Sequence, residues 1–303
     1  MSETLKNIIV PVDFSDHSVN SIDEAILLSK LTQSKIHLLN IIEFNDWWNS
    51  LIINKEIKDK LTELAQLNLK KLTESYPEVH FEMVILFGKR HEQILSYSES
   101  VKANFILLYD KHKDENESKI IGSTVTRIIT KSKCPVITIK NKVVSEINKI
   151  IVPVDLSDKT EAQILSAIEF SKKTNARLHL VSVLFKGFGT KNLRIKAKAQ
   201  RLRSTLKEYN IPFTISLIKK HNAYAYQDIL DFSDKQNADL IIIMTHKENY
   251  GFDNYIGAFA QQIINYSKVP VMTITSEATR SETGTIINNF VDPLGIYDRE
   301  NTI

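Results

Sequence analysis

The segments NIIVPVDFSD, residues 7–16, and KIIVPVDLSD, residues 149–158, are almost the same string written twice. When position 150 is aligned with position 8, eight of the nine positions through Asp16 and Asp158 are identical; we call this the opening alignment. Each copy opens with a short β-branched run, which is typical of a strand buried on both faces of a parallel sheet. Each copy closes with Ser and Asp, which favour the N-cap of a helix. The chain therefore contains a duplicated unit that begins with a strand, a turn and a helix.

A second match lies near the end of each copy. KSKCPVITI, residues 131–139, and YSKVPVMTI, residues 266–274, agree at six of nine positions when position 266 is aligned with position 131; we call this the closing alignment. The opening alignment would instead place position 273 on position 131, so the first copy carries seven extra residues in its middle, which equal about two turns of helix. We expect them to extend the amphipathic helix predicted over residues 50–75. A period of this length is too long for a solenoid repeat and indicates two domains.

Apolar runs alternate with helical patterns through both copies. The predicted strands are residues 7–14, 35–42, 80–87, 104–109 and 135–139, and then 149–155, 177–184, 213–219, 239–245 and 270–274. Strands that alternate with helices indicate right-handed crossovers and a parallel sheet covered on both faces. The predicted fold class is α/β, with tandem doubly wound, five-stranded domains at residues 1–142 and 148–275. The tail, residues 276–303, has a mixed composition that indicates no particular structure.

The composition is that of an ordinary globular protein. The 303 residues are 43% hydrophobic and carry a formal net charge of only +3, which gives no overall signal for nucleic acid or membrane. Cys134 is the one cysteine, so no intramolecular disulfide forms, which suits a reducing cytosol. No apolar run approaches the roughly 20 residues of a spanning helix. We expect a cytoplasmic protein without a membrane segment.

These residues resemble the universal stress protein family in its tandem two-domain form. The resemblance is carried by IIVPVDxSD at both openings and by the closing segments GSTVTRIITKSKCPVITIK and GAFAQQIINYSKVPVMTIT. It covers the chain up to the tail and implies a Rossmann-like fold. Members of this family divide into those that bind ATP and those that do not. The division follows a motif of G-x-x-G, nine residues, then G-[ST].

The motif is incomplete in both copies. In the first, Gly122 and Ser123 close it, but Tyr109 and His112 stand at the two earlier glycine positions. In the second, Gly257 is followed by Ala, and Met244 and Lys247 stand at the earlier positions. Glycine allows the backbone to approach phosphates closely, and a helix N-terminus attracts them. We expect binding of a triphosphate to be lost in the second copy and weakened in the first.

Five residues are candidates for a nucleotide site in the first copy: Asp13, Ile41, Gly122, Ser123 and Thr124. Asp13 ends the first strand, where open α/β sheets bind ligands, and the resemblance places it by a nucleoside. The alternative is that Asp13 only caps the strand–helix turn. Ser123 and Thr124 either hold an anion or act as plain N-caps. Ile41 either lines a base pocket or belongs to the core.

Other patterns favour structural interpretations. His and Cys residues are not at metal-ligand spacing, and no catalytic motif occurs, so we expect neither a metal site nor an enzyme. Residues 191–207 form a predicted helix with seven basic side chains and no acid. A solvated helix face explains it better than nucleic-acid contact. Trp47 and Trp48 follow the second strand; packing against the long helix is the favoured interpretation, and a partner contact or a lid over the cleft are the alternatives.

The predicted function is a non-enzymatic stress-response protein without a cofactor, which acts on an unknown protein partner. The alternative is an adenine-nucleotide sensor that binds ATP or AMP through the first domain. The fifth strands lie at sheet edges, which favour pairing. We expect them to pair the two domains about an internal pseudo-two-fold axis. We further expect that two tandem chains can associate as a homodimer.

Overall fold

The computed structural model describes residues 6–43, 55–109, 121–139, 145–154, 161–184, 189–245 and 256–275. The first repeat consists of β1 (Lys6–Pro11), α1 (Asp16–Thr32), β2 (Ser34–Ile42), α3 (Lys55–Thr73), β3 (Phe81–Phe87), α4 (Arg90–Ser100), β4 (Phe105–Tyr109), α5 (Ser123–Lys131) and β5 (Val136–Ile139). The second consists of β6 (Lys149–Pro153), α6 (Glu161–Thr174), β7 (Arg177–Leu184), α7 (Gly189–Glu208), β8 (Phe213–Lys219), α8 (Ala225–Gln236), β9 (Leu240–Thr245), α9 (Ala258–Tyr266) and β10 (Val271–Thr275).

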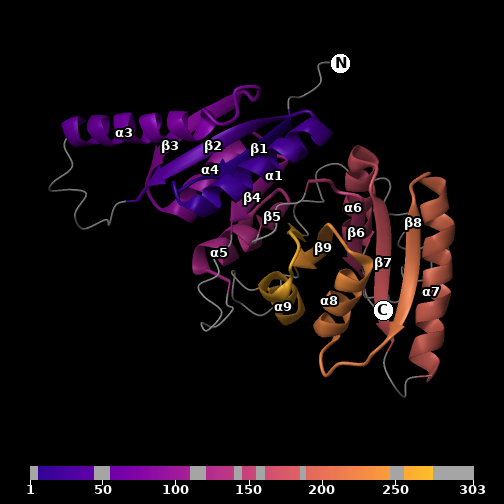
Figure 1. Ribbon diagram of the computed structural model, residues 1–303. Helices are drawn as coiled ribbons and strands as arrows, with labels where there is room; N and C mark the ends of the chain where they lie inside the picture. The colour runs from indigo at the N-terminus through magenta and orange to yellow at the C-terminus, as the bar shows by residue number, and fades with distance from the viewer. Residues whose placement is uncertain are drawn as a thin grey trace, which may run out of the picture.

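The ten strands form one continuous sheet in the order β3-β2-β1-β4-β5-β10-β9-β6-β7-β8 (Figure 1). All pairs within a repeat are parallel, as the α/β prediction requires. β5 and β10 pair antiparallel, with Thr138 opposite Val271 and Val136 opposite Thr273. Two matching hydrogen bonds from side chains reinforce the pair: Thr138 Oγ1 donates to the Val271 carbonyl at 3.2 Å, and Thr273 Oγ1 donates to the Val136 carbonyl at 3.1 Å. Because β5 and β10 are internal, an association of two chains through a sheet edge requires β3 or β8.

Helices cover both faces of the sheet, and each layer crosses from one repeat to the other. One apolar core contains buried residues of α1, α3, α6 and α7, and the other contains buried residues of α4, α5, α8 and α9. Successive strand residues alternate between the cores, as Ile8 and Ile9 do. Phe105 and Phe170 meet edge to face across the junction, with ring centroids 5.8 Å apart. The two repeats therefore share both cores.

The seven extra residues of the first repeat were expected to extend its long helix; this stays a prediction, because residues 50–54 of that predicted helix lie outside the described part of the chain. α3 has 19 residues and α7 has 20. Residues 44–54, which include Trp47 and Trp48, lie outside the described part of the chain. None of the helices in the described part has the length and apolar composition to cross a bilayer.

Candidate functional site

The carboxyl edge of the first repeat brings two of the predicted segments to one place in the sheet. β1 and β4 are neighbours, with Ile8 opposite Phe105, and the chain reverses its direction of travel across the sheet between them. Asp13 follows β1, and Gly122 precedes α5 on the connection that leaves β4. A switch point of this kind is where open α/β sheets bind ligands.

Asp13 holds the turn between β1 and α1. Its Oδ1 accepts hydrogen bonds from the Ser15 backbone N–H at 3.1 Å and from the Ser15 hydroxyl at 2.6 Å. Ser15 is the N-cap residue of α1, as predicted, but its side chain makes no cap hydrogen bond to the helix, so the prediction is right in position and wrong in the bond. Phe14 between them has φ 61°, a left-handed conformation that is uncommon for a bulky residue. The Asp13 side chain is exposed, so a ligand can reach it.

The N-terminus of α5 presents bare backbone. Gly122, not Ser123 or Thr124, is the N-cap residue, and no side chain of that cap bonds to the helix. Its φ is −63°, and a Cβ built on it would meet nothing within 4 Å among the residues that the structure describes. The fold therefore does not require glycine at this position. An anion would be stabilised near the free N–H groups of the helix start, and a glycine there leaves it room to approach them. Ser123 is exposed and Thr124 is half-buried beside it.

The other predicted residues divide between the core and the undescribed loops. Ile41 is 8% exposed and belongs to the core that α4 covers, so its contact with a base stays a prediction. Tyr109, at the first glycine position, is half-buried and packs against the opposite core. His112 and Lys247 lie outside the described residues. The described residues contain no group of three potential metal-ligating side chains.

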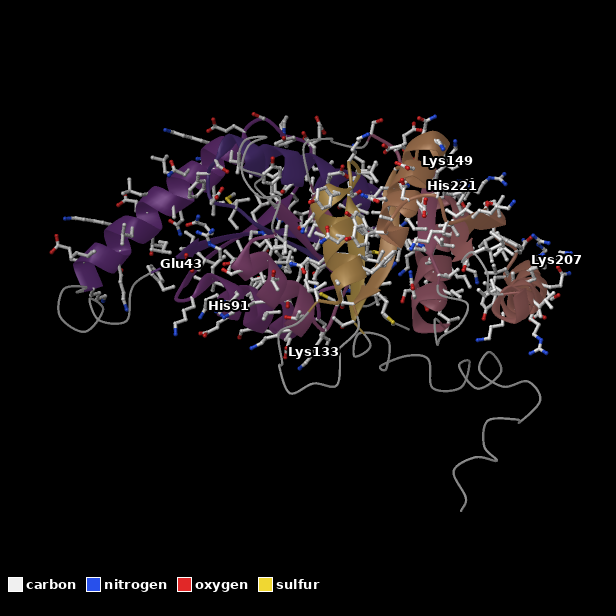
Figure 2. The ribbon with its side chains drawn as sticks, turned by 90° about the horizontal axis from the view of Figure 1, so that it is seen from below. Glu43, His91, Lys133, Lys149, Lys207 and His221 are labelled. Atoms are coloured by element: carbon white, nitrogen blue, oxygen red, sulfur yellow. The ribbon has the colours of Figure 1, made fainter. Side chains whose placement is uncertain are left out.

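Sequence reasoning missed the start of α4, which borders the same edge. Gly88 has φ 134°, a conformation that favours glycine, and its N–H donates to the Ile42 carbonyl at 3.1 Å. Glu43 accepts from the Arg90 backbone N–H at 2.8 Å and lies 3.5 Å from the Arg90 guanidinium. Lys89 is exposed at the N-cap, and His91 follows on the helix (Figure 2). The sequence did carry a signal for this part of the site: three consecutive basic residues directly after a glycine at a strand end.

The equivalent surface of the second repeat is aromatic. The closing alignment places Tyr224 at the position of Lys89, Tyr226 at His91, Phe259 at Thr124 and Tyr266 at Lys131. The Tyr224 and Tyr226 rings stack at 5.8 Å, and the Tyr226 and Tyr266 rings stack at 5.9 Å. Tyr224 is 63% exposed, Tyr266 44% and Phe259 40%. We call these four side chains, on the starts of α8 and α9 and the end of α9, the aromatic surface.

A buried carboxylate holds the turn before this surface. Asp228 Oδ1 accepts from the backbone N–H groups of His221 at 3.2 Å and Asn222 at 3.1 Å, and from the Asn222 side chain at 2.9 Å. Asp228 lies one turn into α8, so these bonds fix the turn that leads to Tyr224 relative to the helix. The aromatic surface therefore rests on a well-bonded segment.

The basic helix α7 has the predicted amphipathic structure. Its stripe of Ile195, Ala199, Leu202 and Leu206 is buried, and the described basic side chains Lys196, Lys198, Arg201, Arg203 and Lys207 are exposed. Lys207 is labelled in Figure 2. Contact of this face with nucleic acid stays untested.

Comparisons with known proteins agree with this architecture. The model of the universal stress protein family matches residues 4–140 and again residues 146–275. Two universal stress proteins of Methanocaldococcus jannaschii are each 26% identical to this chain, over 160 and 144 residues; the matches cover 47% and 45% of this chain and 99% and 82% of those proteins. The crystal structure of a universal stress protein from Archaeoglobus fulgidus superposes with a TM-score of 0.70 at 20% identity, covering 89% of this chain and 98% of that one. A putative universal stress protein from Pseudomonas aeruginosa superposes at 0.62 with 18% identity, covering 89% and 93%. With one family match in each half, the chain belongs to the universal stress protein family as a tandem repeat.

Proposed function

We propose that this protein is a cytoplasmic, non-enzymatic stress-response protein that acts through protein contacts made by the aromatic surface. The stacked tyrosines carry this proposal. Large aromatic side chains dominate the binding energy of protein interfaces, and exposed groups of them are rare on surfaces that bind nothing. The equivalent positions of the first repeat carry Lys89, His91 and Thr124, so the fold itself does not require aromatic residues there.

Site-specific photocrosslinking in cells tests the proposal. A benzophenone amino acid in place of Tyr224 is expected to capture a defined protein partner, because this ring is exposed at the edge of the stack. The matched control places the same group at Lys89, the equivalent exposed N-cap of α4. Replacing Tyr226 and Tyr266 by Ser should abolish the crosslink from position 224. Identical products from positions 224 and 89, or none from 224, would contradict the proposal.

A second candidate function is supported by the N-terminus of α5, namely adenine-nucleotide sensing by the first repeat. Open space at Gly122 and the nearby Asp13 turn favour an anionic ligand at this edge. Against it, Tyr109 places a side chain where the family motif has its first glycine. We therefore propose that this second candidate function is the sensing of AMP rather than of the more highly charged ATP.

Thermal unfolding and calorimetry with ATP, ADP and AMP decide this second candidate. A ligand-dependent rise in melting temperature should be abolished by Gly122→Tyr and retained by Gly257→Tyr, since both glycines face open space. Absence of any shift at millimolar nucleotide removes the sensor function. Incubation with ATP should release no phosphate, and steady release would overturn the non-enzymatic assignment.

A further inference from the structure

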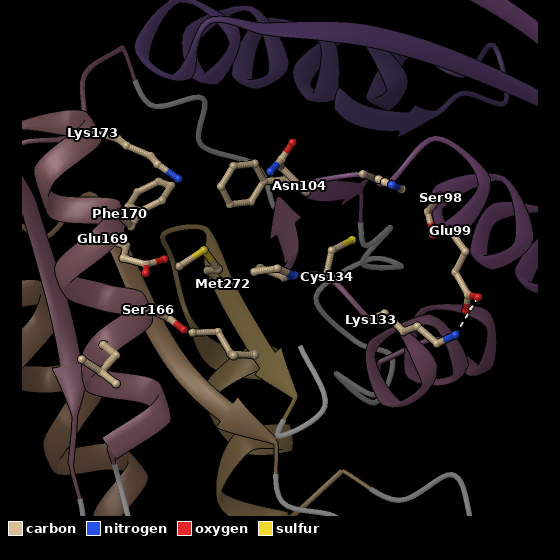
Figure 3. A pocket seen from close by; sticks show the side chains of 16 residues that line it. Ser98, Glu99, Asn104, Lys133, Cys134, Ser166, Glu169, Phe170, Lys173 and Met272 are labelled. Carbon is tan, nitrogen blue, oxygen red and sulfur yellow. Dashed lines mark hydrogen bonds and ion pairs between the residues drawn. The ribbon is translucent and has the colours of Figure 1, made fainter. Parts of the chain in front are cut away.

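A pocket of about 560 Å³ lies at the junction of the two repeats (Figure 3). One wall comes from the end of α4 and the turn before β5, and the facing wall comes from α6. Met272 and Ile274 of β10 line it between these walls. We call it the junction pocket. Its volume is in the range of pockets that hold small organic molecules.

The junction pocket is separate from the candidate nucleotide site. It borders the residues just before β4 and β5, that is, the amino ends of these strands. Asp13 and Gly122 instead follow the carboxyl ends of β1 and β4. The two sites therefore lie at opposite edges of the first repeat's sheet, and the family motif does not contribute to the junction pocket.

The apolar lining depends on both repeats. Phe105 of β4 and Phe170 of α6 meet edge to face at an interplanar angle of 81°. Leu165, Met272 and Ile274 extend this apolar surface from the second repeat. Aromatic and aliphatic walls of this kind stabilise the hydrocarbon part of a ligand by removing it from water.

The charges that line the junction pocket favour an anion. Three lysines face two glutamates, and one pair is already satisfied, since Lys133 Nζ lies 2.7 Å from Glu99 Oε2. Lys102 and Lys173 have no ion-pair partner within the described part of the chain. Figure 3 shows Lys173 and Phe170 on the α6 wall, with Asn104 on the opposite side. One carboxylate, that of Glu169, remains to oppose these two ammonium groups.

Cys134 lines the junction pocket and lies between Met272 and Ser98 in Figure 3. Its Sγ lies 3.5 Å from the Ser132 hydroxyl, and burial raises the pKa of the thiol to about 11. At neutral pH the thiol is therefore uncharged, and it adds polarisable surface rather than a nucleophile. As the sole cysteine of the chain, it also reports on occupancy of the junction pocket.

The position related to the junction pocket by the pseudo-two-fold axis lacks these charged and aromatic residues. In the opening alignment, Leu27, Leu28 and Leu31 of α1 stand where α6 has Glu169, Phe170 and Lys173. Leu28 is buried, and Leu27 and Leu31 pack against the same core. The lysine of the α6 wall therefore has an apolar counterpart, which predicts one anion site per chain rather than two.

We propose that the junction pocket binds one small amphipathic anion, an aliphatic or aromatic carboxylate. Its hydrocarbon part packs against Phe105, Phe170 and Met272. Its carboxylate is neutralised by the ammonium groups of Lys102 and Lys173.

Fluorescence titration of the full chain with 8-anilinonaphthalene-1-sulfonate, an aromatic anion, tests this proposal. One probe per chain should bind, and decanoate should displace it at least tenfold better than decylamine or decanol. Lys102→Gln with Lys173→Gln should weaken decanoate about tenfold. Lys196→Gln with Lys207→Gln, exposed lysines of α7, is the matched control and should change nothing.

Two further measurements locate the bound anion. Ser166→Trp places an indole on the α6 wall at a half-buried position and should abolish probe binding. On the unaltered chain, decanoate should slow the reaction of Cys134 with a thiol reagent, and decylamine should not. Probe binding that survives Ser166→Trp, or Cys134 labelling that decanoate leaves unchanged, overturns the proposal. Equal affinity for decanoate and decylamine overturns its anionic part.

Discussion

The two equivalent histidines of the strands β2 and β7 give a prediction with an internal control. His37 is fully paired: its Nε2 lies 3.0 Å from Asn7 Oδ1, and its Nδ1 lies 3.0 Å from the Tyr97 hydroxyl. Asn7 Nδ2 donates to the Val101 carbonyl at 2.6 Å, which orients the amide with its oxygen toward the ring. His37 Nε2 therefore donates, and Nδ1 accepts from Tyr97.

His179 occupies the same place in the second repeat without these partners. It is 8% exposed, and its Nε2 is buried with no hydrogen-bond partner in the described segments. Lys149 is the equivalent of Asn7 in the opening alignment, and Phe232 is the equivalent of Tyr97 in the closing alignment. Neither offers an acceptor to this nitrogen. The Lys149 ammonium donates instead to the Gln236 carbonyl at 2.9 Å.

Leucine substitutions at the two sites should therefore change stability in opposite directions. His37→Leu leaves Asn7 Oδ1 and the Tyr97 hydroxyl without their partner and should cost about 1–3 kcal/mol in the free energy of unfolding. His179→Leu removes one unsatisfied buried nitrogen and places apolar volume in the core, which should stabilise by about 1 kcal/mol.

The pH dependence gives a second test at His179. Burial, with smaller contributions from Lys149 and Arg177, lowers the pKa of His179 below 6.5. The unfolded state then binds more protons below pH 6.5, so the contribution of this neutral histidine is complete above that pH and is lost as the pH falls toward its folded pKa. His179→Leu should reduce the loss of stability between about pH 7.5 and about pH 5.

Urea unfolding followed by circular dichroism, at about pH 7.5 and about pH 5, measures both effects. His37→Leu is the matched control, because burial also lowers the pKa of that histidine. The reasoning is refuted if His179→Leu destabilises the protein by more than about 1 kcal/mol at the higher pH. It is also refuted if that variant keeps the full acid sensitivity of the unaltered chain.

Three other predictions test the sites. Gly122→Tyr and Gly257→Tyr should each change the free energy of unfolding by less than about 0.5 kcal/mol in urea melts, because the new side chains enter open space at ordinary φ values. A loss above about 2 kcal/mol would show that the space is filled. Asn265→Leu should cost about 1–3 kcal/mol in the same assay, since it leaves the buried N–H of Ile121 unpaired, and a neutral result would discount this contact between repeats. Burial raises the pKa of the Cys134 thiol to about 11, so at about pH 8 the thiol of the folded chain should react with iodoacetamide far more slowly than that of the urea-unfolded chain. Equal rates would show an ionised or exposed thiol.

The order of strands and helices was predictable because it depends on local patterns. β-branched runs such as that of β6 and the buried stripe of α7 are visible in single segments, and the structure confirms both. The prediction for the first turn was only partly right, since Ser15 is the N-cap residue of α1 but its hydroxyl donates to Asp13 and makes no cap hydrogen bond to the helix. Both interactions use the same residue types in the same order, so the pattern alone does not distinguish them.

The candidate site was predictable only in part for a related reason. Asp13 and Gly122 were found because motif and strand order locate them. The basic start of α4 and its aromatic equivalent in the second repeat were missed, although the closing alignment extends back to α4 and α8. Lys89 and Tyr224 are recognised as surface residues beside the candidate site only when the start of α4 is seen next to α5, and the start of α8 next to α9.

The sequence by itself determined that this protein is two duplicated α/β domains, because hydrophobic periodicity and an internal repeat are properties of neighbouring residues. Only the tertiary structure decided what the duplication produced. The register of Thr138 on Val271, the contact of Phe105 with Phe170 and the isolation of His179 each join residues distant along the chain. These features depend on how two nearly equal halves pack together, and identical local patterns leave that packing undetermined.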